Sequence, residues 1–154
     1  MGRTRAGAWS TSRREGGFVA LYNDTVLDHY RHPRNVGMLA EANAVGRAEN
    51  AACGDELHLY LEVQAGQVLQ ARFRTFGCAA SIAAGSMLTE LLAGASLTEA
   101  QEFTSEAVNT ALGGLPPLKI HGSVLAADAL RAALEDHQKR CKAENPDPIT
   151  QTSS

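Results

Sequence analysis

The chain has 154 residues, of which 44% are hydrophobic and 20% charged, and its net charge is −3. This length and balance favour one globular domain. No apolar run approaches the roughly 18 residues of a membrane span. Arg3, Arg5, Arg13 and Arg14 concentrate positive charge near the start, so the rest of the chain is more acidic. An acidic body argues against nucleic acid as the main partner, and we expect no membrane partner either.

The three cysteines, Cys53, Cys78 and Cys141, are widely spaced. A secreted disulfide framework more often has an even number of cysteines. The sequence also has no secretory apolar segment. We therefore expect a cytoplasmic protein, because thiols stay free in that reducing compartment and are available for metal or sulfur chemistry.

Residues 1–17 are rich in Gly, Ser, Thr and Arg and have no apolar period, which predicts a disordered basic tail. A folded domain is predicted over residues 18–142. Residues 143–154 are polar and contain two prolines, so a disordered C-terminal tail is expected there. Within the domain, apolar residues at helical spacing predict a first helix over 18–32, which Pro33 ends.

The next segment changes to a period of two. Leucine and valine alternate with polar residues over 57–63, which predicts a half-buried strand. A tight reversal at residues 65–67 leads into a second strand over 68–76. Residues 44–50 read as a further strand, and together these predict a small antiparallel sheet.

Helical patterns return after Gly77. Helices are predicted over 79–93, with Gly94 just past the end, and over 96–103 and 104–112. A long helix is predicted over 124–142, with one apolar stripe formed by Val124, Ala127, Leu130, Leu134 and His137. The fold class is therefore α+β: a three-stranded antiparallel sheet packed against an N-terminal helix and several C-terminal helices.

Three short patches carry residues that can bind metal. Cys53 and Asp55 lie in a predicted turn, Cys78 lies where a strand meets a helix, and His121 precedes the last helix. Thiolate, imidazole and carboxylate groups are the ligands of zinc and iron. Each residue also has an ordinary explanation as a buried thiol, a turn residue or a helix cap. The residue types alone leave both interpretations open.

Four motifs resemble one known family. They are LYNDTVLDHYRHPRNVG at 21–37, ACGD at 52–55, FRTFGCAASIA at 73–83 and LPPLKIH at 115–121. In this order they are similar to the U-type iron–sulfur cluster assembly scaffolds, the IscU and NifU N-terminal family. The resemblance runs in register from about residue 20 to 140, which is nearly the whole predicted domain.

The resemblance implies that Cys53, Asp55, Cys78 and His121 hold a transient [2Fe–2S] cluster, or else Zn²⁺ or Fe²⁺. The third cysteine of the family should follow the histidine, and here that position is Gly122. Cys141 cannot take its place, because a helix would carry it about 28 Å away. The ligand set implied by the resemblance is therefore poorer in thiolate than that of the family, and we expect weak, labile binding.

The resemblance also implies partners: a cysteine desulfurase, apo iron–sulfur client proteins and an Hsp70-type chaperone system. The chaperone would grip Leu115, Pro116, Pro117, Leu118 and Lys119, which we expect to form an extended, exposed loop. A stiff connector with a solvated lysine is the alternative for this loop.

Several functions remain open at this stage. The resemblance implies a scaffold and not an enzyme, although a cysteine nucleophile with His121 as its base would fit the residue types. No motif for an oxyanion hole accompanies them. The alternatives to a scaffold are a zinc-binding sulfur acceptor and a degenerate paralogue that keeps only its interactions.

Overall fold

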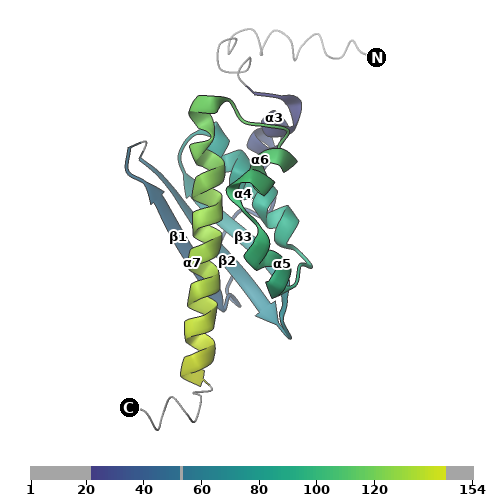
Figure 1. The fold of residues 1–154 in the computed structure, drawn as a ribbon, viewed down its shortest axis with the longest axis vertical. Helices are drawn as coiled ribbons and strands as arrows, with labels where there is room; N and C mark the ends of the chain where they lie inside the picture. The colour runs from purple at the N-terminus through teal and green to yellow at the C-terminus, as the bar shows by residue number, and fades with distance from the viewer. Residues whose placement is uncertain (1–21, 53, 145–154) are drawn as a thin grey trace.

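The fold is described from a computed structural model over residues 22–52 and 54–144. Its elements are, in order, α3 (Asp24–Arg31), β1 (Ala44–Asn50), β2 (Asp55–Gln64), β3 (Gln67–Phe76), α4 (Ala79–Leu92), α5 (Leu97–Glu102), α6 (Ser105–Ala111), the 3₁₀ turn η2 (Pro117–Lys119) and α7 (His121–Glu144). One helix, three strands and then further helices confirm the predicted α+β class (Figure 1). The predicted basic tail and the start of the first predicted helix lie outside the described residues. Most of the predicted C-terminal tail does so too, but its first residues belong to α7.

The sheet is antiparallel, with the strand order β1-β2-β3. The predicted reversal between β2 and β3 is a two-residue turn, in which Ala65 and Gly66 have φ values of 54° and 76°. Positive φ at both central residues matches the twist of a hairpin. The register shifts between Glu62 and Val63, so that Val63 pairs with Val68 while Glu62 pairs with Gln70. This irregularity lets Val68 and Ala71 face the same core, where both are buried.

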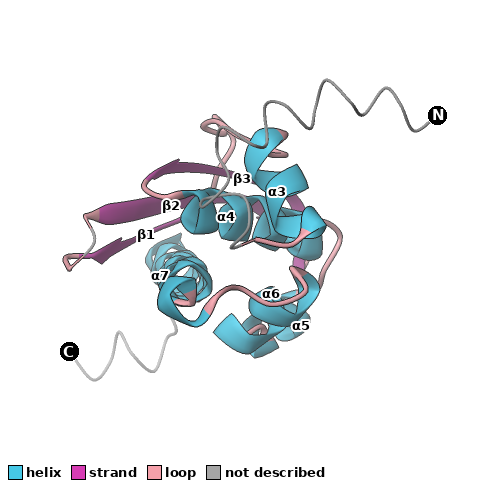
Figure 2. Ribbon diagram, turned by 90° about the horizontal axis from the view of Figure 1, so that it is seen from above, coloured by secondary structure: helices cyan, strands magenta, loops and turns pink. Residues whose placement is uncertain are grey.

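Helices α4 and α7 cover one face of the sheet, as the view along α7 shows (Figure 2). The alternation of β2 sends its leucines into this layer, where Leu57, Leu59 and Leu61 are fully buried. Gly46 on β1 lies directly against the backbone of α7, since a Cβ there would overlap with Ala129 and Ala133. The core therefore lies between the sheet and the two long helices, and a close approach of β1 sets the position of α7.

The long helix α7 begins earlier than predicted, and its buried face follows the predicted stripe only in part. It begins at His121 and not at Val124, and Val124 is 41% exposed. Most of its buried residues are small; they include Ser123, Leu125, Ala126, Ala127, Ala129, Leu130 and Ala133, of which Ala127 and Leu130 belong to the predicted stripe. Alanine is the residue that allows a helix to lie this close to a strand, but its weak hydrophobicity did not mark the face in the sequence.

The proline-rich segment is not extended as predicted. Pro117–Lys119 forms one turn of 3₁₀ helix, closed by a hydrogen bond of 2.8 Å from the Lys119 amide to the Pro116 carbonyl. Proline is compatible with a first helical turn, because its missing N–H has no partner to bind there. The prediction of exposure holds for Leu118, which is 89% exposed, whereas Leu115 is buried.

The short helix α3 is fixed to α4 by a buried polar contact. Asn23 caps α3 by accepting a hydrogen bond of 2.9 Å from the amide of Val26. His29 is buried, and its Nδ1 lies 2.7 Å from the Ser86 hydroxyl of α4. The same hydroxyl accepts a hydrogen bond from the Arg34 amide at 2.9 Å, which ties the following turn to α4. Among the described helices, none has the length and apolar character that crossing a membrane requires.

Candidate metal site

Three side chains with metal-binding atoms converge at one end of the helical layer. Asp55 begins β2, Cys78 is the N-cap residue of α4, and His121 is the first residue of α7. Cys78 Sγ lies 3.4 Å from Asp55 Oδ2 and 3.6 Å from His121 Nε2, and His121 Nε2 lies 3.2 Å from Asp55 Oδ2. All three ligand atoms lie within 4.8 Å of one another. The carboxylate is buried, while the thiol and imidazole are only partly covered, so the cluster opens to solvent on the cysteine and histidine side.

The β2–β3 pairing brings Asp55 and Cys78 together. Glu56 pairs with Phe76, so the residues that flank this pair, Asp55 and Gly77, lie next to each other. A Cβ at Gly77 would lie 2.7 Å from the Asp55 carboxyl carbon. Glycine is therefore required there, because any side chain would push the carboxylate away from Cys78.

The start of α7 brings His121 to the same place. The turn η2 leads directly into this helix, and the Ser123 hydroxyl donates a hydrogen bond of 2.8 Å to the Ile120 carbonyl in its first turn. At Gly122 a Cβ would lie 2.8 Å from the carbonyl carbon of Ala80 and 2.9 Å from its oxygen. The first turn of α7 thus rests on the backbone of the first turn of α4, and this contact carries His121 next to Cys78.

Asp55 is held as a carboxylate. Ser81 is fully buried and donates a hydrogen bond of 2.7 Å to Asp55 Oδ2. Burial by itself raises the pKa of the Asp55 carboxyl, but the hydrogen bonds from Ser81, Cys78 and His121 outweigh burial and hold this pKa below its ordinary value. The ionised form is therefore present at neutral pH, ready to bind a cation.

A phenol also lies near this cluster. Tyr22 is buried, and burial, with the nearby thiol of Cys78 as a smaller cause, raises the pKa of its hydroxyl. Tyr22 therefore stays neutral at physiological pH and adds no charge to the site.

The four predicted ligands divide into two groups, and Cys141 stays apart from both. Asp55, Cys78 and His121 come together, whereas Cys53 lies outside the described residues. Cys141 sits far along α7, which is continuous from His121, so the predicted separation of about 28 Å holds.

Sequence reasoning missed Ser81 and the contact of Gly77 with Asp55. Ser81 lies three residues after Cys78 in a predicted helix, a spacing that puts both residues on one face and was available as a signal.

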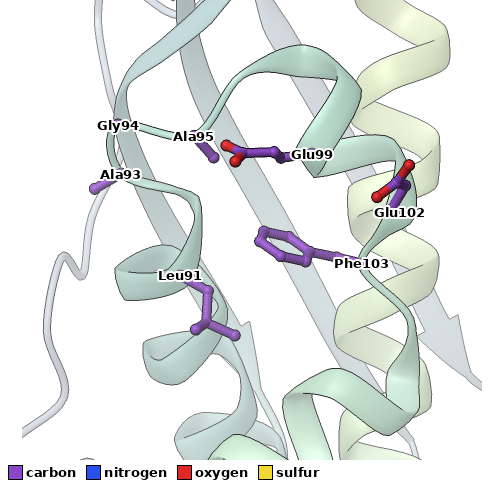
Figure 3. Close-up of a pocket in the computed structure, with 7 residues that line it drawn as sticks. All are labelled: Leu91, Ala93, Gly94, Ala95, Glu99, Glu102 and Phe103. Carbon is purple, nitrogen blue, oxygen red and sulfur yellow. The ribbon is translucent and has the colours of Figure 1, made fainter.

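A separate pocket lies at the other end of α4. It has a volume of about 540 Å³ and is lined by Leu91, Ala93, Gly94, Ala95, Glu99, Glu102 and Phe103 (Figure 3). One of the acidic side chains of the pocket already has a partner. The Glu99 carboxylate accepts a hydrogen bond of 3.0 Å from the Ser96 amide, as part of the capping box of α5. The pocket shares no residue with the Asp55–Cys78–His121 cluster.

The architecture matches a known class of protein. The chain matches the NifU-like N-terminal domain family over residues 21–144 and belongs to that family. A solved structure of the N-terminal part of a NifU-like protein from Brucella abortus has a TM-score of 0.66 at 20% identity. It covers 78% of this chain and 96% of its own, so the likeness of fold extends over most of both chains.

Named relatives are closer in sequence. The iron–sulfur cluster assembly scaffold protein IscU 1 of Archaeoglobus fulgidus is 47% identical over 120 residues, which are 78% of each chain. The iron–sulfur cluster assembly scaffold protein IscU of Aquifex aeolicus is 43% identical over 118 residues, which are 75% of each chain. These relatives match the family predicted from the four motifs.

Proposed function

We propose that this chain is a scaffold in iron–sulfur cluster assembly, which holds a nascent [2Fe–2S] cluster as cargo at Cys53, Asp55, Cys78 and His121. The observation that carries the proposal is the convergence of the Asp55, Cys78 and His121 ligand atoms from three different elements. The scaffold names of its relatives from Archaeoglobus fulgidus and Aquifex aeolicus support the same role.

The separations within the cluster fit tetrahedral coordination. Metal–nitrogen and metal–oxygen bonds of about 2.0–2.1 Å and metal–sulfur bonds of about 2.3 Å put neighbouring ligand atoms about 3.3–3.6 Å apart. The three separations here are 3.2, 3.4 and 3.6 Å. Tetrahedral sites with sulfur and nitrogen ligands suit zinc and the iron of iron–sulfur clusters.

The chemistry of the ligands suits temporary binding. Histidine can replace cysteine on an iron–sulfur centre, and the harder Asp55 carboxylate is a weaker partner for a soft centre than a thiolate. With glycine at position 122, Cys53 and Cys78 would be the two thiolates of this set. We infer that cargo is held weakly and released readily, which a protein that passes clusters to others requires.

The partners follow from this role. Sulfur would come from a cysteine desulfurase as a persulfide, and the finished cluster would pass to apo client proteins. We propose that the segment Leu115–Lys119 is where an Hsp70-type chaperone binds. The exposure of Leu118 supports this, because the turn presents an apolar side chain to solvent just before His121.

A zinc-binding sulfur acceptor is the second candidate function. It is favoured by the same separations, which suit a single tetrahedral zinc ion as well as a cluster iron. In that case zinc would hold the site, and a cysteine thiol would accept sulfur without a cluster being built. A paralogue that keeps only its interactions would show neither property.

Anaerobic reconstitution with iron, sulfide and a desulfurase tests the proposal, with visible absorption and metal analysis as the readouts. We expect the wild type to form a chromophore and Cys78→Ser to lose it. Cys141→Ser is the matched control, since it removes a thiol outside the cluster and should form the same chromophore as the wild type. A wild type without a chromophore would refute the scaffold role. Stoichiometric zinc that resists replacement would then favour the sulfur acceptor.

A further inference from the structure

A second pair of metal-binding side chains lies on α7, away from the candidate site. His137 and Cys141 are four residues apart on the helix, so their side chains lie on the same face, one turn from each other. Cys141 Sγ is 3.6 Å from His137 Nε2 and 3.9 Å from His137 Nδ1. Cys141 is a free, exposed thiol, so an ion can reach the pair from solvent.

We propose that His137 and Cys141 form a two-ligand site for a thiophilic divalent cation, with Zn²⁺ as the natural ligand. Zinc bonds of about 2.0–2.1 Å to nitrogen and about 2.3 Å to sulfur put the two ligand atoms about 3.6 Å apart across a tetrahedral angle. The observed Sγ to Nε2 separation is 3.6 Å. An ion can therefore bind both atoms with little change of either side chain.

The backbone that carries the pair is fixed to the body of the domain. Asp136 Oδ2 accepts a hydrogen bond of 2.9 Å from the amide of Val45 and lies 3.0 Å from Arg140 Nε. Arg140 also donates to the carbonyl of Ala42 at 3.5 Å. These contacts hold the turn between His137 and Cys141 helical, so less conformational entropy is lost when an ion bridges the two side chains.

The types of ligand define the class of ion. Thiolate and imidazole together suit zinc and other borderline or soft cations, whereas magnesium and calcium require oxygen ligands. Asp136 is held by Val45 and Arg140, so water completes the coordination shell. Two protein ligands with water give a weaker and more rapidly exchanging site than a closed structural zinc site with four protein ligands.

Cadmium titration of the full-length, metal-free protein tests this site, because a cadmium–thiolate bond absorbs in the near ultraviolet. The variants are His137→Gln and Cys141→Ser, with His32→Gln, an exposed histidine at the end of α3, as the matched control. Equilibrium dialysis with zinc gives the stoichiometry, and far-ultraviolet circular dichroism shows that each variant keeps its helices.

We expect Cys141→Ser to bind one equivalent of metal fewer than the wild type. His137→Gln should weaken this equivalent by at least about tenfold, which is what losing even an outer-sphere partner costs a metal site. His32→Gln should leave it unchanged. Equal affinity in His137→Gln and wild type would overturn the proposal, because the thiol would then bind metal alone.

This outcome is independent of the scaffold role. Cys78→Ser tests the Asp55–Cys78–His121 cluster in the same titration and should leave the Cys141 equivalent in place. If both equivalents disappear in Cys78→Ser while circular dichroism is unchanged, the site on α7 does not exist.

Discussion

Adding a side chain at Gly122 tests the contact between α7 and α4 that positions His121 in the candidate site. A Cβ there would lie 2.8 Å from the Ala80 carbonyl carbon, whereas carbon atoms in contact lie about 3.5–4.0 Å apart. The nearest atoms belong to the backbone of α4, so no rotation of a side chain relieves the overlap. Overpacking of this kind costs about 1–3 kcal/mol, and replacing glycine in a helix returns at most about 1 kcal/mol.

We therefore expect Gly122→Ala to lower the free energy of unfolding by about 1–2 kcal/mol. For a domain of this size that corresponds to a fall in Tm of about 2–8 °C. Zinc binding should weaken as well, because moving the first turn of α7 away from α4 takes His121 away from Cys78. Gly122→Cys should lose similar stability, and its added thiolate should not produce the tight binding that three cysteines would give.

Chemical denaturation and zinc competition on the wild type, Gly122→Ala and Gly122→Cys provide the measurements. Gln138→Ala, an exposed substitution on the same helix, is the control and should change stability by no more than about 0.5 kcal/mol. The reasoning fails if Gly122→Ala is as stable as the wild type and binds zinc equally well. It also fails if Gly122→Cys gains stability and affinity together.

Three further predictions concern buried polar groups. Ser81→Ala should cost about 1–2 kcal/mol at pH 7. The loss should shrink only as the pH falls below 3.8 and through the lowered pKa of Asp55, which denaturation of both proteins at pH 7 and in this acidic range measures. Asp55→Cys adds a soft ligand without moving α7 and should tighten zinc binding by at least about tenfold, or about 1.4 kcal/mol, in chelator competition; unchanged affinity would contradict this. Burial, and next the charge of Arg34, lowers the pKa of the buried His29 below its ordinary 6.5. The unfolded state therefore binds more protons than the folded state below that pH, and the free energy of unfolding should fall as the pH drops below about 6.5. A Tm series from pH 8 to 5 should show this slope in the wild type and in His32→Gln, but not in His29→Gln.

The local patterns of the sequence predicted most of the fold. Alternation of polar and apolar residues is a strong signal, and the buried Leu57, Leu59 and Leu61 of β2 lie where it put them. The pattern of apolar residues gave the wrong prediction where the structure depends on something other than the burial of large apolar side chains. The face that α7 turns to the sheet is made largely of alanine, and the turn at Pro117–Lys119 depends on a single backbone hydrogen bond.

The site was less accessible to sequence reasoning than the fold. His121 and Asp55 are 66 positions apart in the chain, and no local period connects them; the resemblance to a family did. Ser81 and the contact of Gly77 with Asp55 were missed because a serine in a helix and a glycine before one have many ordinary explanations. Their roles arise only when β2, α4 and α7 meet at Asp55.

The position of the His121 side chain therefore depends on the glycine at position 122. They are adjacent residues in the first turn of α7, and that turn rests on α4 because position 122 has no side chain. Lifting the turn to accommodate a thiol would move the imidazole, which lies 3.6 Å from Cys78 Sγ. In this backbone, any side chain at position 122 therefore requires the first turn of α7 or of α4 to shift. The described part of the site thus combines one thiol with an imidazole and a carboxylate, and we expect it to hold soft cargo more weakly than a site with three thiolates would.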